Sequence, residues 1–119
     1  MSARLATVDD VPALVAMRRQ LMEHFGWVEA SDPSGDAWVT RLDHVLRDGI
    51  PAGTVVASVV PNELGELVAS GVATIIDQLP SPALPHGQYA HISSVFTEPD
   101  HRGRGFGRVV VEVLIDALR

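Results

Sequence analysis

The chain reads Val-Phe-Thr-Glu-Pro-Asp-His-Arg-Gly-Arg-Gly-Phe-Gly-Arg from Val95 to Arg108, and a strongly amphipathic segment follows directly. Pro99 predicts a turn after a strand, and the glycines predict a loop whose backbone can approach a ligand closely. The amphipathic segment predicts a helix, and a helix N-terminus presents unpaired N–H groups with a partial positive charge. Together with three arginines, this arrangement favours binding of an anion such as a phosphate. The alternative is a purely structural glycine turn with solvated arginines.

The segments around this loop differ in periodicity. An apolar stripe runs through residues 106–119, which predicts the helix, and residues 89–97 predict the strand before the loop. Residues 54–60 and 67–76 are rich in β-branched side chains and flank a Pro-Asn-Glu-Leu-Gly turn, so they predict a β-hairpin. A proline-rich connection at 80–85 separates this hairpin from the last strand.

The first half of the chain is predicted to be mainly helical. Residues 2–6 predict a short strand, and apolar spacing over residues 10–25 predicts a helix with Asp9 as its N-cap. A second short helix is predicted over residues 38–46, ended by Asp48 and Gly49. The predicted order is therefore strand, helix, helix, three strands, helix, which is an α/β protein of the α+β type.

Composition limits the possible functions. With 119 residues, of which 46% are hydrophobic, the chain is predicted to form one domain, 1–119. It has no apolar run long enough to span a membrane and no signal-peptide pattern, so we expect a cytoplasmic protein without a membrane partner. The absence of cysteine excludes disulfides, thiolate metal ligands and a cysteine nucleophile.

Charge is distributed unevenly along the chain. The net charge of −6 argues against a nucleic-acid partner. All nine basic residues are arginine, and three of them, Arg102, Arg104 and Arg108, lie within seven residues. A local positive excess in an acidic chain favours a specific anionic ligand.

The stretch from Val95 to Arg108 resembles the acyl-CoA binding motif of the GNAT superfamily of N-acetyltransferases. The core signature of that family is Arg or Gln, two residues, Gly, one residue, then Gly or Ala, which corresponds here to Arg102, Gly105 and Gly107. The preceding Val-x-x-x-Pro and the upstream order of two helices and a hairpin are also typical. The resemblance implies a mixed, mainly antiparallel sheet flanked by helices.

The same resemblance implies direct transfer of an acetyl group from acetyl-CoA, the co-substrate, to an amine acceptor, with no metal. The implied pyrophosphate loop comprises Arg102, Gly103, Arg104, Gly105, Phe106, Gly107 and Arg108. The implied strand end, whose backbone pairs with the pantetheine amides, comprises Val95, Phe96 and Thr97.

The general base is the least determined part of the site. By the period-two rule, His91 and Ser93 share one strand face with Val95, and His91 has a suitable intrinsic pKa to act as base directly or through water. A hydrogen-bonded structural histidine is the alternative. Glu98 is interpreted as a solvated turn residue.

The acceptor side is expected to involve the variable loops 26–35 and 79–88. Candidate pocket residues, which can equally be surface residues at a helix end, are Glu23, His24, Trp27 and Asp77. The acidic net charge mildly suits a cationic acceptor.

The sequence departs from the family pattern after the last helix, because the family generally continues with a further strand, a helix and closing strands. The family's thiolate-protonating Tyr lies on that later helix, and Tyr89 does not correspond to it. We therefore expect an uncovered last strand and exposed apolar side chains at Val109, Val113 and Leu114. Three explanations stay open: a fragment of a longer enzyme, a chain completed by another subunit as a homo-oligomer or swapped dimer through the last strand and helix, or a non-catalytic CoA-binding or assembly module.

Overall fold

A computed structural model describes residues 2–27 and 36–119 of this protein, which is built on a four-stranded sheet in the order β1-β2-β3-β4. The strands are β1 (Arg4–Leu5), β2 (Val55–Pro61), β3 (Leu67–Asp77) and β4 (Gln88–Thr97). The helices are α1 (Val11–His24), α2 (Asp36–Ala52) and α3 (Phe106–Leu118), with 3₁₀ turns η1 (Val8–Asp10) and η3 (Pro99–His101). Each pair of neighbouring strands is antiparallel. The α/β prediction and the predicted element order are confirmed.

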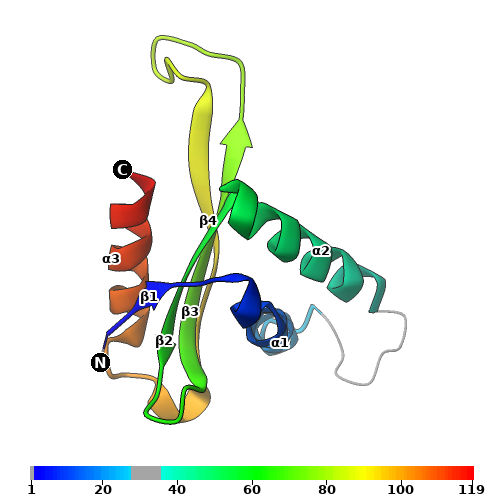
Figure 1. The fold of residues 1–119 in the computed structure, drawn as a ribbon, viewed down its shortest axis with the longest axis vertical. Helices are drawn as coiled ribbons and strands as arrows, with labels where there is room; N and C mark the ends of the chain where they lie inside the picture. Colours follow the sequence, from blue (N-terminus) through cyan, green and yellow to red (C-terminus); the bar gives the residue numbers. More distant parts are fainter. Residues whose placement is uncertain (1, 28–35) are drawn as a thin grey trace.

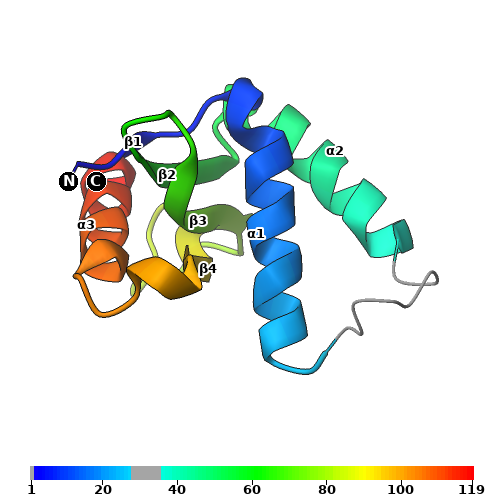
Figure 2. The ribbon, with the colours of Figure 1, turned by 90° about the horizontal axis from the view of Figure 1, so that it is seen from below.

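The sheet separates two helical layers. Helices α1 and α2 lie on one face and α3 lies on the other, as Figures 1 and 2 show from two directions. Apolar side chains bury between the sheet and the first two helices; the most buried include Val11, Leu14, Leu46, Val55 and Val59. On the α3 face, the buried Ser58 hydroxyl donates a 2.7 Å hydrogen bond to the carbonyl of Val110, which ties α3 to β2.

Strands β3 and β4 form a long hairpin that extends beyond the helices (Figure 1). At its tip, the N–H of Gln78 donates to the carbonyl of Gly87 at 2.7 Å, and Gly87 has a positive φ of 69°. The predicted hairpin of β2 and β3 is also confirmed. Its turn is held by the Asn62 side chain, which accepts from the N–H groups of Leu64 and Glu66.

The predicted end of α2 is wrong, because the helix continues through Gly49 to Ala52. Gly49 is buried, and a Cβ built on it would lie 2.5 Å from a methyl group of Val55. Its role is therefore close packing of α2 on β2, rather than termination. The helix ends at Gly53, with φ of 81°, where the N–H of Gly53 donates to Ile50 and that of Thr54 donates to Gly49. These two bonds form a Schellman motif.

The prediction that Leu114 is exposed on α3 is wrong, because its side chain is fully buried. It packs over Gly71 of β3, where an added Cβ would lie 2.9 Å from its Cδ1 atom. Val109 and Val113 are half-buried. The apolar stripe of α3 therefore covers the sheet, and Ile115, 40% exposed, is the large α3 side chain that faces outward.

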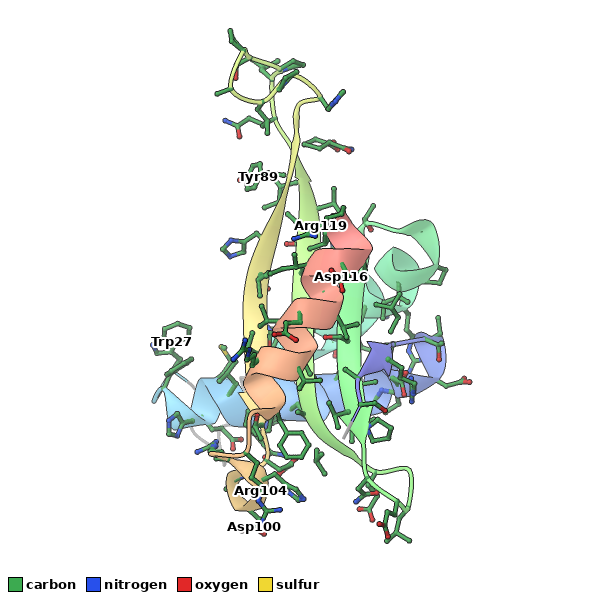
Figure 3. All side chains as sticks on the ribbon, turned by 90° about the vertical axis from the view of Figure 1, so that its left-hand side faces the viewer. Trp27, Tyr89, Asp100, Arg104, Asp116 and Arg119 are labelled. Carbon is green, nitrogen blue, oxygen red and sulfur yellow. The ribbon has the colours of Figure 1, made fainter. Side chains whose placement is uncertain are left out.

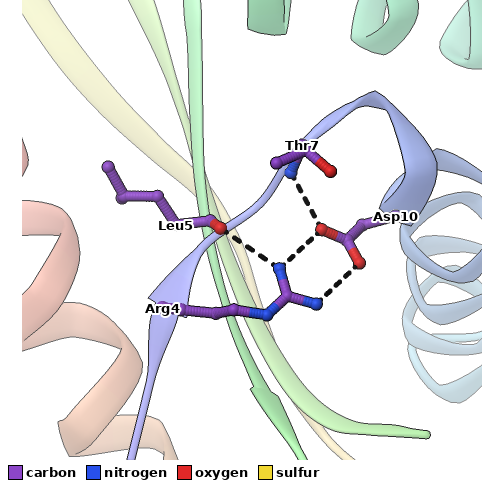
Figure 4. Close-up of polar contacts among 4 residues, drawn as sticks. All are labelled: Arg4, Leu5, Thr7 and Asp10. Carbon is purple, nitrogen blue, oxygen red and sulfur yellow. Dashed lines mark hydrogen bonds and ion pairs between the residues drawn. The ribbon is translucent and has the colours of Figure 1, made fainter. Parts of the chain in front are cut away.

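The start of α1 is held by an ion pair that the sequence did not predict (Figure 4). Arg4 donates two hydrogen bonds to the carboxylate of Asp10, at 2.8 and 3.0 Å, and the N–H of Thr7 donates to the same carboxylate at 2.8 Å. The predicted N-cap, Asp9, is instead exposed inside η1. The hydrogen bonds from Arg4 lower the pKa of Asp10 below its usual value.

We expect Asp10→Asn to lower the free energy of unfolding by about 1 kcal/mol at pH 7. Because the folded pKa of Asp10 is lowered, the contribution is complete above the unfolded value, about 3.9, and is lost as the pH falls through the lower folded pKa. Urea unfolding should therefore show a smaller difference from wild type at pH 3 than at pH 7. The matched control is Asp9→Asn, which should show little change, and an equal loss at both pH values for Asp10→Asn would contradict this account.

Candidate functional site

The loop between β4 and α3 exposes a run of backbone N–H groups. Gly103 and Gly105 have φ angles of 79° and 82°, a region that favours glycine, and Gly105 is the N-cap of α3. In the part of the chain that the structure describes, none of the N–H groups from Gly103 to Arg108 donates to a protein acceptor. A Cβ built on Gly103 or Gly105 meets no atom within 4 Å. These positions therefore open onto space that a ligand can occupy, and the N-terminus of α3 adds a partial positive charge.

The three arginines of the loop have different surroundings. The Nε atom of Arg102 donates to the carbonyl of Thr97 at 3.1 Å, and its guanidinium lies 5.8 Å from the centre of the Phe96 ring. Arg102 thus fastens the loop to the end of β4. Arg108 forms a 2.9 Å ion pair with Glu112 at the surface, whereas Arg104 is exposed (Figure 3). Full charges and free N–H groups are therefore concentrated at one end of α3.

Strand β4 is the last strand of the described sheet, so its outer edge has no strand partner there. A bulge interrupts its pairing with β3: Val72 lies opposite Ser94, but Ala73 lies opposite Ile92, which leaves Ser93 as the extra residue. Bulges turn a strand and change the face onto which its side chains project. An open edge of this kind can accept a further extended segment by main-chain hydrogen bonds.

This bulge corrects the prediction that His91 and Val95 share one face. His91 lies opposite Thr74, which faces α1 and α2, whereas Val95 lies opposite Gly71, which faces α3. Residues directly opposite each other in an antiparallel pair project to the same face, so His91 and Val95 project to opposite faces. Val95 lies against the N-terminus of α3, with its Cγ1 atom 3.9 Å from a Cβ built on Gly107.

A cavity of about 270 Å³ lies between α1, α2 and the sheet. Its polar lining residues come from four elements: Arg18, Trp38, Arg41, Thr74 and Ser93. The guanidinium of Arg18 donates a 3.2 Å hydrogen bond to the carbonyl of Ser93, so α1 contacts β4 at the bulge. The cavity therefore reaches the strand that precedes the glycine loop.

This cavity is not lined by the candidate acceptor-pocket residues Glu23, His24, Trp27 and Asp77. Trp27 is 71% exposed and projects outward beyond α1 (Figure 3). Asp77 is at the far end of β3, where it accepts a hydrogen bond from Gln88. Of the two predicted loops, 79–88 forms the distant hairpin tip, and most of 26–35 lies outside the described residues.

The sequence analysis missed Arg18 and Arg41, which lie on α1 and α2 and line the cavity. A usable signal existed, since neither arginine has an acidic residue three or four positions away along its helix with which it could pair. Trp38 was placed correctly on the second helix, but its position in a cavity depends on how α2 packs against α1.

Within residues 2–27 and 36–119, no group of three or more metal-ligating side chains is close enough to hold a metal ion. No helix in these same ranges is sufficiently long and apolar to cross a membrane.

The family of the chain follows from comparison with known proteins. The model of the Acetyltransferase (GNAT) family matches residues 13–119. This match covers most of the sequence, including most of α1, all of α2 and the glycine loop. The chain belongs to the GNAT acetyltransferase family. A comparison with curated protein sequences finds no significant match.

Solved structures share the fold at low sequence identity. A predicted acetyltransferase from Clostridium acetobutylicum, crystallised with acetyl-CoA, has a TM-score of 0.84 and 20% identity over 98% of this chain and 71% of that chain. A GCN5-related N-acetyltransferase from Ralstonia eutropha JMP134 has a TM-score of 0.83 and 20% identity, covering 98% and 74%. An aminoglycoside acetyltransferase from an uncultured soil metagenomic sample, in complex with sisomicin, has a TM-score of 0.68 and 14% identity, covering 98% and 68%. These similarities confirm the GNAT-like fold.

Proposed function

We propose that this protein transfers an acetyl group from acetyl-CoA directly to a primary amine. The observation that carries the proposal is the run of unpartnered N–H groups from Gly103 to Arg108 beside the open edge of β4. A pyrophosphate needs several converging N–H donors, and the glycines supply them without side chains in the way. The relative crystallised with acetyl-CoA supports the choice of this ligand.

In the proposed complex, the loop residues Arg102 to Arg108 hold the pyrophosphate. The backbone of Val95, Phe96 and Thr97 pairs with the pantetheine amides as an added strand would, and a strand N–H near Val95 polarises the thioester carbonyl. Arg102 contributes by fixing the loop to Thr97, so that the N–H groups stay oriented before the ligand arrives.

The proposed reaction starts from an ammonium ion. The acceptor loses one proton, its nitrogen attacks the thioester carbonyl carbon, and a C–N bond forms as the C–S bond breaks. The nitrogen loses a second proton, the sulfur takes one, and the net products are an amide, free CoA and one proton. His91 stays a prediction as base: it is exposed and lies on the sheet face of the cavity, although it does not line the cavity itself.

Two measurements separate this proposal from a non-catalytic CoA-binding module. Acetyl-CoA at about 100 times its Kd should stabilise the fold by about 2.7 kcal/mol, which raises the Tm by about 10 °C. Adding an amine panel should then release free CoA thiol. Stabilisation without thiol release favours the non-catalytic module, and the absence of stabilisation contradicts both functions.

Pairing with a second copy through β4 and α3 also stays a prediction. Ile92 and Val95 of β4 are exposed, which is consistent with it. A monodisperse monomer in light scattering would count against pairing.

A further inference from the structure

The cavity between α1, α2 and the sheet has an unusual balance of polar groups. Arg18 and Arg41 line it, whereas no Asp or Glu of the described residues does. Trp38 adds an indole N–H that is buried and has no hydrogen-bond partner in the described part of the chain. Two guanidinium groups and a free N–H favour an anionic group and oppose an additional ammonium group.

Neighbouring acidic residues do not cancel these charges. On α2, Asp43 is paired with Arg47 at 2.9 Å, and on α1, Glu23 lies 3.5 Å from Arg19. Arg41 is exposed and forms no ion pair with any described residue, and Arg18 contacts a carbonyl rather than a carboxylate. The local charge of the cavity is therefore opposite in sign to the net charge of the chain.

The rest of the lining is aliphatic and comes from both helices and the sheet: Leu14, Leu42, Val45, Leu46, Val55 and Val72. Cavities for drug-sized ligands usually measure about 300–1,000 Å³. At about 270 Å³, this cavity suits a smaller molecule with an apolar part. Because it reaches Ser93 at the β4 bulge, such a molecule would lie beside the strand on which the thioester is proposed to bind.

We infer that the acceptor is a small amino carboxylate with an apolar substituent, such as an apolar α-amino acid. Its carboxylate binds Arg41 and Arg18, its side chain occupies the aliphatic lining, and its amine faces β4. The inference rests on the proposed acetyl transfer and specifies its acceptor. The acetyl group then forms an amide with the α-amine, CoA leaves as the thiol, and one proton is released.

The test compares acceptors that differ only in the carboxylate. L-leucine, L-methionine and L-phenylalanine are each measured against their amides and against spermidine, by thiol release at saturating acetyl-CoA. We expect at least one amino acid to exceed its amide by a factor of ten or more in kcat/KM. Arg41→Gln should raise the KM for that amino acid by a factor of about ten and leave the KM for acetyl-CoA within a factor of two. The matched control is Arg47→Gln, an exposed arginine on the same helix that does not line the cavity and should change neither constant.

A binding measurement separates this inference from the proposed reaction. In a Trp27→Phe variant, Trp38 is the remaining tryptophan, so its fluorescence should change when the amino acid binds in the presence of CoA. Binding without thiol release from any amine would overturn the proposed reaction and retain the assigned ligand class. Equal or better turnover of the amides or spermidine, or no fluorescence change with any of the three amino acids, would overturn the inference itself.

Discussion

Replacing Gly105 with valine is expected to raise the Kd for acetyl-CoA by a factor of about 100, or about 2.8 kcal/mol. Gly105 has a φ of 82°, so a β-branched residue there forces the backbone to rearrange. Its side chain would also enter the open space in front of the loop, where a Cβ meets no protein atom within 4 Å. Both effects disturb the N–H groups that are proposed to hold the pyrophosphate. Isothermal titration with acetyl-CoA measures the change.

Gly65 provides the matched control for this variant. It has the same φ of 82°, and a Cβ built on it also meets nothing within 4 Å, but it lies in the turn between β2 and β3. Gly65→Val should therefore cost a similar amount of stability, about 1–3 kcal/mol, without changing the Kd. If the two variants bound acetyl-CoA equally well, the glycine loop would not be the CoA site.

Truncating Leu114 to alanine is expected to lower the free energy of unfolding by about 3 kcal/mol. The side chain is fully buried between α3 and β3, over Gly71, and the close approach of helix and strand leaves little freedom to collapse around a cavity. The loss of unfolding free energy measures how strongly the sheet stabilises α3. The N-terminus of this helix also presents the N–H groups of the glycine loop. Urea unfolding monitored by circular dichroism gives the value.

The neighbouring Ile115 is the control for Leu114, because it is 40% exposed on the same helix. Ile115→Ala should cost well under 1 kcal/mol. Equal losses for the two variants would mean that the stripe of α3 facing the sheet has been assigned incorrectly.

Most of the fold could be predicted because its signals are local. The β-branched runs, the Asn-Glu-Leu-Gly turn and the apolar stripe of α3 each specify their element without reference to the rest of the chain. The glycine loop before α3 is also a local signal, and Gly103 and Gly105 have the positive φ angles that favour glycine.

The errors arise where a residue acts through a distant neighbour. Glycine commonly ends a helix, but Gly49 lies inside α2, where only a residue without a side chain leaves room for the Val55 methyl group. The bulge at Ser93 places the side chains of His91 and Val95 on opposite faces of the sheet. The bulge arises from the pairing of β4 with β3, which the sequence of β4 alone does not specify. The cavity is lined by Arg18, Trp38 and Thr74, which lie on separate elements, so no single stretch of sequence predicts it.

Amide NMR during a titration with CoA observes the N–H groups of the glycine loop themselves, which are proposed to hold the pyrophosphate. We expect the largest chemical-shift changes at the amides of Gly103 to Arg108, with smaller changes along Val95 to Thr97. Gly53 precedes β2, at the end of that strand away from the glycine loop, and its amide should not shift. Saturable binding that leaves the amides of Gly103 to Arg108 unshifted would contradict the assignment of this loop as the pyrophosphate site.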